Sequence, residues 1–497
     1  MRLNPYGHWE LYVHGTAPER GLQIGQLSQH LLLDQEQYMF DFIESKGASE
    51  RHLQFLKYFV AFFNRNLPDH IPIEYRAEIL GLSESLPREF DFVGPAYMRA
   101  LHYHAAHDIG HALQNMNLVA CTSFGAWNQY SQNGSLIIGR NLDFYIGDAF
   151  AEEKIIAFLT PEQGYKAMFV TWPGMLGACS GMNEHGLCAT INSAKSGIPL
   201  QTGTPIALLI REILQYAKTI DEALSIAKKR RVMVSETILI GSTNDGCAAL
   251  IEVSPKGATL HEAKSGQLNC TNHFQSDRFT HTRRNKTSIA ESSSVYRMQR
   301  LKQLEDSIGQ LNPEKAALIL RDRKGLYNAD VGIGNELAIN QLIAHHSVIF
   351  QPEQGLVWVS TNPFTLGTYV CYDVKATFQK GVVVSADSLN IAPDPWLISG
   401  GYARYVEHKI LREKIEIATE SLTADQVTPT ELSAFKAGNP EFYYTYQVLG
   451  DYFAAMNQYD IAIEHYETGL KKQIPRLVDL EELKSRIEKA KKSLARS

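Results

Sequence analysis

A β-hairpin between residues 120 and 144 constrains this chain more than any other feature of its sequence. An Asn133-Gly134 pair, a strong signal for a tight turn, is followed by an apolar run over residues 135–138. The turn separates Ala120-Cys121-Thr122-Ser123-Phe124-Gly125-Ala126-Trp127 from Gly139-Arg140-Asn141-Leu142-Asp143-Phe144. The sequence therefore predicts a cysteine that opens one strand and an Arg-x-x-Asp pair at the end of the other.

Length and composition limit the protein classes to which such a hairpin can belong. The chain has 497 residues, 44% of them hydrophobic, which is enough for a large core and two or three domains. Its net charge of -6 arises from balanced totals of 48 basic and 54 acidic residues, so no nucleic-acid partner is expected. Six scattered cysteines predict reduced core residues, with room for one reactive thiol, rather than a disulfide framework.

The N-terminal residues carry no targeting signal that the sequence makes visible. Residues 1–8 lack a basic flank followed by an apolar segment, and no run of about 18 apolar residues occurs in the chain. We therefore expect a soluble cytoplasmic protein without a transmembrane segment, unless a leader is missing from this sequence.

Residues 1–120 are expected to be mostly helical. Residues 12–15 and 20–25 contain glycines and are expected to lead into a helix. A later helix is predicted to end near Asn66, before Pro68, because apolar residues recur there at spacings of three and four. These apolar residues are Leu53, Leu56, Phe59, Val60 and Phe63.

Four histidines near the end of this region raise the question of a metal site. They are His102, His104, His107 and His111, of which the last two are spaced to share one helix face. Zinc needs further ligands and a supporting shell, and Asp108 is the only carboxylate nearby. Surface or packing roles are therefore favoured over a metal centre.

From Cys121 onward the pattern changes to strands. Further strands are predicted over residues 155–159, 166–171, 237–240, 248–253, 347–350, 356–360 and 368–374, with another pair of strands ending at Cys270. Helices are predicted from Ile206 through Ala227 and from about Ser292 to Leu311. Runs of strands with helices between them favour antiparallel sheets covered by helical layers, an α+β core.

The chain is expected to become helical again from about residue 401. Tyr446, Leu449-Gly450, Phe453, Ala462 and Tyr466 fit the spacing of a tetratricopeptide repeat, followed by a capping helix over residues 479–495. One repeat is too little for an independent solenoid. The tail is therefore expected to pack on the core, on a second copy in a homo-oligomer, or on a protein partner.

The chemistry of the hairpin is ambiguous when each residue is taken alone. Cys121 could be a buried core cysteine, and Arg140 with Asp143 could be an ordinary surface ion pair. In favour of catalysis, a cation beside a thiol favours the thiolate, and a carboxylate can orient an amine.

Five motifs in the same order make the catalytic interpretation specific. They are Cys121-Thr122, Gly139-Arg140-Asn141-Leu142-Asp143, Met182-Asn183-Glu184-His185-Gly186-Leu187 with Asn192, Thr271-Asn272, and Arg297. Together they resemble the cysteine N-terminal-nucleophile (Ntn) hydrolases, and among these the penicillin acyltransferase (acyl-CoA:6-aminopenicillanic acid acyltransferase), choloylglycine hydrolase and acid ceramidase relatives. The resemblance spans roughly residues 5–385.

This resemblance implies a four-layer αββα sandwich over residues 121–400. It is preceded by a helical pro-segment, residues 1–120, and followed by the helical tail, residues 401–497. It also implies that the precursor cuts itself before Cys121. The freed α-amino group, with a pKa of about 8, would then act as the base for the thiol of the same residue.

The resemblance also assigns roles to the other site residues, and it implies neither a cofactor nor a metal. Asparagines at strand ends and arginines on helix surfaces have commoner uses, but their joint occurrence favours the catalytic roles. Asp143 would hold the amine, Arg140 would stabilise the thiolate and orient substrate, Asn192 and Asn272 would line the oxyanion hole, and Arg297 would complete the polar network.

The expected protein is an autoproteolytic amidase or N-acyltransferase that forms an acyl-thioester on Cys121. N-acylated small molecules with a hydrophobic acyl group are the expected substrates, acyl-CoA donors are a second option, and hydrolysis and transfer stay open. One competing interpretation is a non-enzymatic interaction protein that keeps the fold and binds partners through its helical tail. Another is a metal hydrolase that uses the histidines from His102 to His111.

Overall fold

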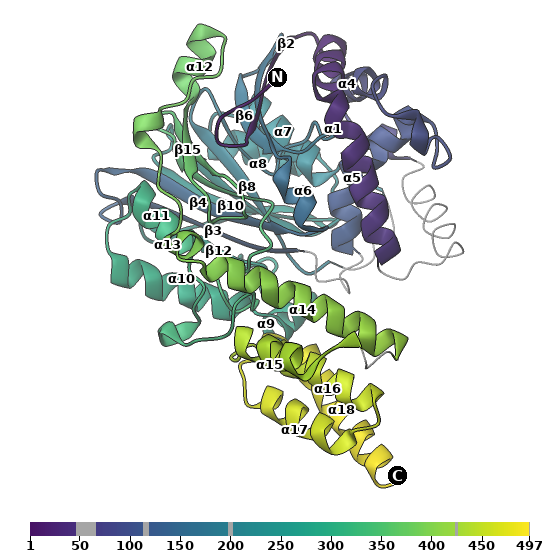
Figure 1. Cartoon of the computed structure of the whole chain (residues 1–497). Coiled ribbons are helices and arrows are strands. Elements are labelled where there is room, and N and C mark those ends of the chain that lie inside the picture. Colours follow the sequence, from purple (N-terminus) through teal and green to yellow (C-terminus); the bar gives the residue numbers. More distant parts are fainter. Residues whose placement is uncertain (46–65, 113–118, 197–201, 423–425, 497) are drawn as a thin grey trace. The chain divides into compact units, whose positions relative to one another are not determined.

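The computed structural model describes residues 1–45, 66–112, 119–196, 202–422 and 426–496 (Figure 1). The chain divides into two compact units. The first comprises Met1–Lys286, Leu304–Leu320 and Ile343–Ala392, and the second comprises Thr287–Gln303, Arg321–Leu342 and Pro393–Ser497. The sequence-based division at residues 120 and 400 stays a prediction. The predicted helix that contains Leu53 to Phe63 lies outside the described residues.

Two sheets form the centre of the first unit. The larger has nine strands in the order β1-β2-β5-β6-β7-β8-β9-β10-β11, and the smaller has six in the order β12-β3-β4-β13-β14-β15. The nine strands are β1 (Arg2–Leu3), β2 (Trp9–Gly15), β5 (Ile155–Pro161), β6 (Ala167–Thr171), β7 (Ser180–Asn183), β8 (Leu187–Ser193), β9 (Glu236–Ser242), β10 (Cys247–Ser254) and β11 (Gly257–Glu262). The six are β12 (Gln267–Cys270), β3 (Val119–Asn128), β4 (Gly134–Phe144), β13 (His346–Gln351), β14 (Leu356–Ser360) and β15 (Tyr369–Asp373).

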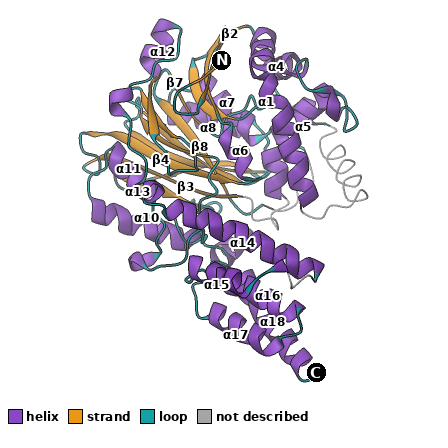
Figure 2. Ribbon diagram, viewed as in Figure 1, coloured by secondary structure: helices purple, strands orange, loops and turns teal. Residues whose placement is uncertain are grey.

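Helices cover the outer face of each sheet, which gives the layer order αββα (Figure 2). Helices α7 (Ile206–Tyr216) and α8 (Ile220–Lys229) pack on the larger sheet, against β8 and β10. Strand β3 faces β8 across the sandwich, and α11 (Pro313–Leu320) packs on β4 from the other side. The predicted α+β class and the four-layer αββα order are confirmed.

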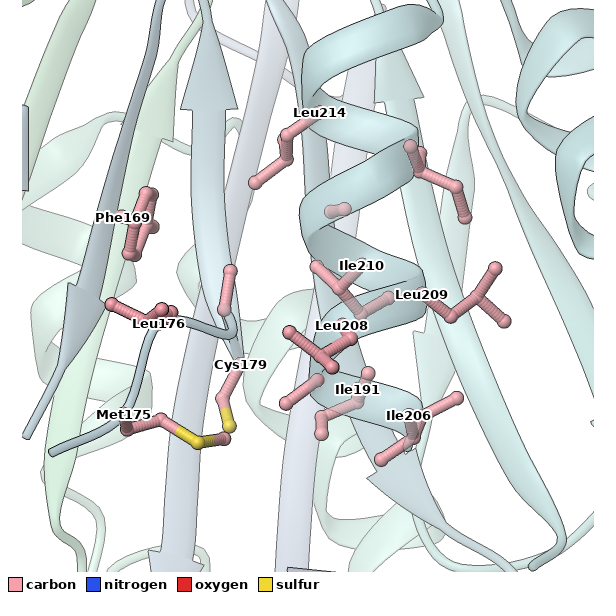
Figure 3. Close-up of a cluster of buried hydrophobic side chains, with 14 of the residues drawn as sticks. Phe169, Met175, Leu176, Cys179, Ile191, Ile206, Leu208, Leu209, Ile210 and Leu214 are labelled. Atoms are coloured by element: carbon pink, nitrogen blue, oxygen red, sulfur yellow. The ribbon is translucent and has the colours of Figure 1, made fainter. Parts of the chain in front are cut away.

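Helix α7 is buried almost all round, as its continuous apolar sequence requires. Leu208 and Ile210 of α7 belong to the same buried cluster as Ile191 of β8 and Leu176 (Figure 3). The carboxylate of Asp108 accepts the N–H of Ile206 at 3.0 Å, so one donor at the start of the helix is satisfied inside the protein. This packing fixes the strand that carries Asn192.

The predicted hairpin is present and pairs Cys121 with Leu142 and Ser123 with Arg140. Gly134 has φ +78, a conformation that glycine adopts at little cost in tight turns. A register shift between Ala126 and Asn128 marks a bulge near the turn end. Cys121, Arg140 and Asp143 therefore lie in the regular, fully paired portion of the hairpin.

Two local predictions are wrong. Residues 12–15, expected at the entry to a helix, lie in strand β2, which pairs in parallel with β5. Apart from β1 and β2, the described part of the N-terminal segment is mostly helical, as expected. The single helix predicted from Ile206 through Ala227 is two helices, because the Thr219 hydroxyl accepts the N–H of Glu222 at 3.2 Å and caps a new helix.

The remaining helices belong to the N-terminal segment, to the joins between strands and to the C-terminal region. They are α1 (Ala17–Ser45), α3 (Leu67–His70), α4 (Ile73–Ser83), α5 (Ala96–Ala112), α6 (Asp148–Glu152), α9 (Arg283–Glu291), α10 (Ser294–Ile308), α12 (Val374–Lys380), α13 (Pro395–Ile398), α14 (Gly401–Ser421), α15 (Pro429–Gly438), α16 (Tyr443–Ala455), α17 (Tyr459–Leu470) and α18 (Leu477–Leu494). None of the described helices combines the length and apolar character needed to cross a bilayer.

The C-terminal helices of the second unit have a core of their own. Tyr466 and Ala462 of α17 pack with Leu483 and Ile487 of α18. At Gly450 of α16, an added Cβ would lie 2.3 Å from the Tyr466 ring, so the missing side chain permits the close approach of α16 and α17. The tail is therefore helical, whereas its assignment to the tetratricopeptide class stays a prediction.

Candidate active site

The β3–β4 hairpin brings Cys121 and Arg140 to the same face of the smaller sheet. Residues two apart in a strand share a face, as do residues directly opposite each other, so Cys121, Ser123 and Arg140 project together. This face looks onto the larger sheet, because the Ser123 hydroxyl donates to Oδ1 of Asn192 at 2.8 Å. The candidate nucleophile therefore lies between the two sheets.

The Cys121 thiol is buried beside a cation. Cys121 is 1% exposed, and Nη2 of Arg140 lies 3.7 Å from its sulfur atom. Burial raises the pKa of Cys121 to about 11 because a thiolate would lose its hydration there; Arg140 lowers this pKa, and the nearby carboxylates of Asp143 and Glu236 raise it. In the uncut chain the thiol is therefore protonated at neutral pH.

Arg140 and Asp143 do not form the surface ion pair considered above, because both residues are fully buried. Asp143 lies directly opposite Ala120 in the ladder, next to the peptide bond between Ala120 and Cys121. On the other side of this bond, Oδ1 of Asn272 accepts the N–H of Cys121 at 3.0 Å. Two of the predicted site residues thus border the peptide group that self-cleavage would cut.

The two asparagines are held by specific hydrogen bonds. Nδ2 of Asn272 donates to the carbonyl oxygen of Ser193 at 2.9 Å and to its hydroxyl at 3.0 Å. Nδ2 of Asn192 donates to the carbonyl oxygen of Cys270 at 3.2 Å. Both side chains therefore lie in the first unit near Cys121, with their N–H groups engaged by protein oxygens in the uncut chain.

Arg297 belongs to the second unit, whereas the other five predicted site residues belong to the first. It lies in α10 and is 1% exposed, so the alternative of a helix-surface arginine is wrong. Its Nε donates to the Ser293 hydroxyl at 3.4 Å. Its participation in the site stays a prediction.

The histidines considered as metal ligands are only partly described, since the side chains of His107 and His111 lie outside the described positions. Nε2 of His104 accepts the N–H of Leu176 at 2.9 Å, and its Nδ1 lies 2.7 Å from the Ala100 carbonyl oxygen. Burial lowers the pKa of His104 to about 4. His104 is thus a neutral packing histidine, and the described residues contain no cluster of three or more potential metal ligands.

Four polar residues around the site were not singled out from the sequence: Ser123, Ser180, Ser193 and His346. The alternation of β3 could have placed Ser123 beside Cys121, because the two residues are two apart in a predicted strand. Ser180 and His346 come from strands distant in sequence and meet at Arg140 only through the stacking of the two sheets. No spacing signal identifies them.

The central part of the chain matches a known family. Residues 129–360 match the model described as "Acyl-coenzyme A:6-aminopenicillanic acid acyl-transferase". Over these residues the chain is similar to the penicillin acyltransferases. The matched stretch contains Arg140, Asp143, Asn192, Asn272 and Arg297 and begins eight residues after Cys121.

Three curated proteins are similar to this chain. Protein dcd1B of Dictyostelium discoideum is 26% identical over 266 residues, covering 51% of this chain and 50% of that protein. Protein dcd1A of the same organism is 26% identical over 231 residues (44% and 51%), and an uncharacterized protein of Archaeoglobus fulgidus is 25% identical over 199 residues (37% and 33%). The chain therefore spans about half or less of the length of these relatives.

Two solved structures show a weak likeness to this chain. The N-acylethanolamine-hydrolyzing acid amidase ortholog of Caenorhabditis elegans has a TM-score of 0.33 at 17% identity, covering 47% of this chain and 93% of that one. A mutant conjugated bile acid hydrolase of Clostridium perfringens has a TM-score of 0.33 at 12% identity, covering 49% and 89%.

Proposed function

We propose that the chain is a self-processing cysteine Ntn hydrolase that cleaves or transfers the acyl group of an N-acylated small molecule through an acyl-thioester on Cys121. The proposal is supported above all by what surrounds one peptide bond. The thiol of Cys121 lies beside Arg140, its N–H donates to Asn272, and Asp143 stands opposite Ala120.

Self-cleavage begins when the Cys121 sulfur attacks the carbonyl carbon of Ala120. A C–S bond forms, the C–N bond to Cys121 breaks, and the thiol proton passes to the departing nitrogen. Water then hydrolyses the thioester. The first 120 residues end in a carboxylate, and Cys121 keeps a thiol and gains a free amine.

Turnover uses this new amine as the base. With a pKa of about 8, the amine takes the thiol proton while Asp143 orients it and Arg140 stabilises the thiolate. The sulfur then adds to the substrate carbonyl. The amine group of the substrate leaves with the proton held by Cys121, and water or an acceptor amine resolves the thioester.

Asn192 and Asn272 are proposed to donate to the oxyanion, where one donor is typically worth about 3 kcal/mol of transition-state stabilisation. Their N–H groups donate to Cys270 and Ser193 in the uncut chain, so these hydrogen bonds must be exchanged for bonds to substrate. Arg297 is proposed to complete the polar network.

The substrates we propose are N-acylated small molecules with a hydrophobic acyl group, because the relatives that the sequence resembles share that substrate class. The matching family model is named for an acyl-coenzyme A transferase, so acyl-CoA is tested as a donor alongside N-acyl amides. Release of free acid and transfer to an added amine are measured in the same reaction.

Self-cleavage is tested on the purified full-length chain by gel electrophoresis and N-terminal sequencing. The wild type should give fragments of 120 and 377 residues (497 minus 120), the longer beginning at Cys121. Cys121→Ala should stay whole, whereas Cys188→Ala should be processed normally, because Cys188 lies in the apolar layer between the sheets. A wild-type chain that stays intact after prolonged incubation would rule out the free-amine mechanism.

A further inference from the structure

The guanidinium of Arg140 is held by uncharged groups. Besides the Cys121 sulfur, it donates to the Ile191 carbonyl oxygen, to the Ser180 hydroxyl at 2.6 Å and to Nε2 of His346 at 3.3 Å. Arg140 and His346 are both fully buried. Buried arginines usually pair with a carboxylate, and a hydrogen-bonded histidine and serine in that place need an explanation.

The direction of each hydrogen bond follows from the arginine, which can only donate. The contact between Arg140 and Nε2 of His346 is therefore a hydrogen bond when Nε2 accepts, which places the ring proton of His346 on Nδ1. The Ser180 hydroxyl accepts from Arg140 and donates to Nε2 of His346 at 2.8 Å. In this tautomer the single lone pair of Nε2 accepts mainly from Ser180 at 2.8 Å and shares the longer 3.3 Å contact with Arg140.

The same assignment extends to a second histidine. Nδ1 of His346 lies 2.8 Å from Nδ1 of His345, so His346 donates and His345 accepts. The His345 ring packs against Phe150 and Trp172, with ring centroids 4.8 and 5.3 Å away. This packing fixes the His345 ring, which is the last member of the series of hydrogen bonds that begins at Arg140.

Both histidines are kept neutral by their surroundings. Burial lowers the pKa of each, and the charges of Lys154 and Arg140 lower it further; His345 adds to the effect on His346. Lys154 itself is buried, and its Nζ donates to Oδ1 of Asn362 at 2.7 Å. A protonated imidazole at His346 would also lose the acceptor that Arg140 requires.

We propose that Ser180, His346 and His345 are positioning residues that hold the Arg140 guanidinium against the Cys121 sulfur, and that its hydrogen-bond partners among the described residues are neutral by design. A carboxylate in the place of His346 would fix the guanidinium equally well but would cancel its charge. Neutral partners leave that charge to lower the pKa of the thiol against the opposing effects of Asp143 and Glu236. The use of the thiolate as a nucleophile rests on the proposed function.

Two substitutions of His346 separate this role from packing. In His346→Gln the side-chain amide oxygen can occupy the place of Nε2, so the acceptor for Ser180 and Arg140 is kept. In His346→Asn the shorter amide replaces Nδ1, so the bond to His345 is kept and the acceptor for Arg140 is lost. The matched control is His8→Asn, because His8 is another buried neutral histidine, bonded to Tyr372 and Ser360.

The readout is the rate of Cys121 alkylation by iodoacetamide from pH 6 to pH 10, followed by peptide mass spectrometry on the full-length protein. His346→Asn should move the profile upward by about one pH unit, which makes alkylation about tenfold slower below the midpoint. His346→Gln should follow the wild type. His8→Asn should lower the melting temperature without moving the profile.

The proposal is overturned if His346→Asn and His346→Gln both follow the wild type, or if His8→Asn moves the profile as far as His346→Asn does. Failure of the proposed function is a separate result: Cys121→Ala would then still be processed or active. An inactive Cys121→Ala together with an unmoved His346→Asn profile would leave the function standing and remove only the positioning role.

Discussion

Glu78 joins the two pieces that self-cleavage would produce. It lies in α4 and accepts from Arg20 of α1 at 2.7 Å and from Arg211 of α7 at 3.3 Å. The side chains of Glu78 and Arg211 are fully buried, and that of Arg20 is 1% exposed. Because Arg20 and Glu78 precede residue 121 and Arg211 follows it, the cluster connects the N-terminal segment to the two-sheet sandwich. Strand β2, which also precedes residue 121, connects the two pieces a second time because it pairs with β5.

Glu78→Ala should therefore destabilise the protein strongly. The substitution leaves two buried guanidinium groups without the carboxylate that they share, and breaking a buried pair in this way typically costs about 3–5 kcal/mol. We would measure it by urea unfolding in the uncleaved Cys121→Ala background, so that one chain unfolds. The midpoint should fall by roughly 1–2 M. In the processed wild type, the two fragments should co-purify, and Glu78→Ala should weaken their association.

The control for this prediction is Glu212→Ala. Glu212 also pairs with an arginine, Arg230, at 2.7 Å, but the two side chains are 14% and 32% exposed. A partly exposed pair is worth about 1 kcal/mol or less. If Glu78→Ala costs no more than Glu212→Ala, the buried cluster does not hold the segment in place and the reasoning is refuted.

Three further predictions concern the thiol, acid stability and the C-terminal helices. Asp143→Asn should lower the pKa of Cys121, seen as faster alkylation at neutral pH, because a carboxylate that raises it is gone, yet it should slow turnover because the amine loses its partner. His104 has a pKa lowered from 6.5 to about 4, so its contribution to stability is present above pH 6.5 and lost as the pH falls toward 4. Between pH 7 and pH 5 this loss is about 2 kcal/mol, and urea unfolding of His104→Gln should show a correspondingly smaller pH dependence. Gly450→Ala should cost about 1–3 kcal/mol in the second unit, measured by calorimetry, because the new methyl group meets the Tyr466 ring.

The features that local sequence signals determine were the ones predicted well. The Asn133-Gly134 turn, the two strands beside it and the hairpin of β13 and β14 all depend on contacts between residues close in sequence. Strand β2 was missed because its partner β5 begins at Ile155, and a parallel pairing at that distance leaves no local signal. The break before α8 depends on a single cap at Thr219.

The candidate site divides in the same way. Cys121 and Arg140 share a hairpin, so their proximity followed from strand register. Asn192 and Asn272 could be named only through a family resemblance, because stacking of the two sheets brings them to Cys121. Neither the register of the hairpin nor the family resemblance pointed to His346. Its position in a predicted strand was foreseeable, but its contact with Arg140 depends on which face of the sheet looks inward.

The proposed mechanism assigns different bases to its two stages. In the uncut chain the nitrogen of Cys121 is a peptide N–H that donates to Asn272, so it cannot accept a proton. With a thiol pKa of about 11, roughly one molecule in ten thousand carries the thiolate at pH 7. After cleavage the same nitrogen is an amine with a pKa of about 8 and lies where Asn272 and Asp143 can hold it. Self-cleavage should therefore be slow and accelerate with pH, whereas turnover by the processed enzyme should already be efficient near neutrality.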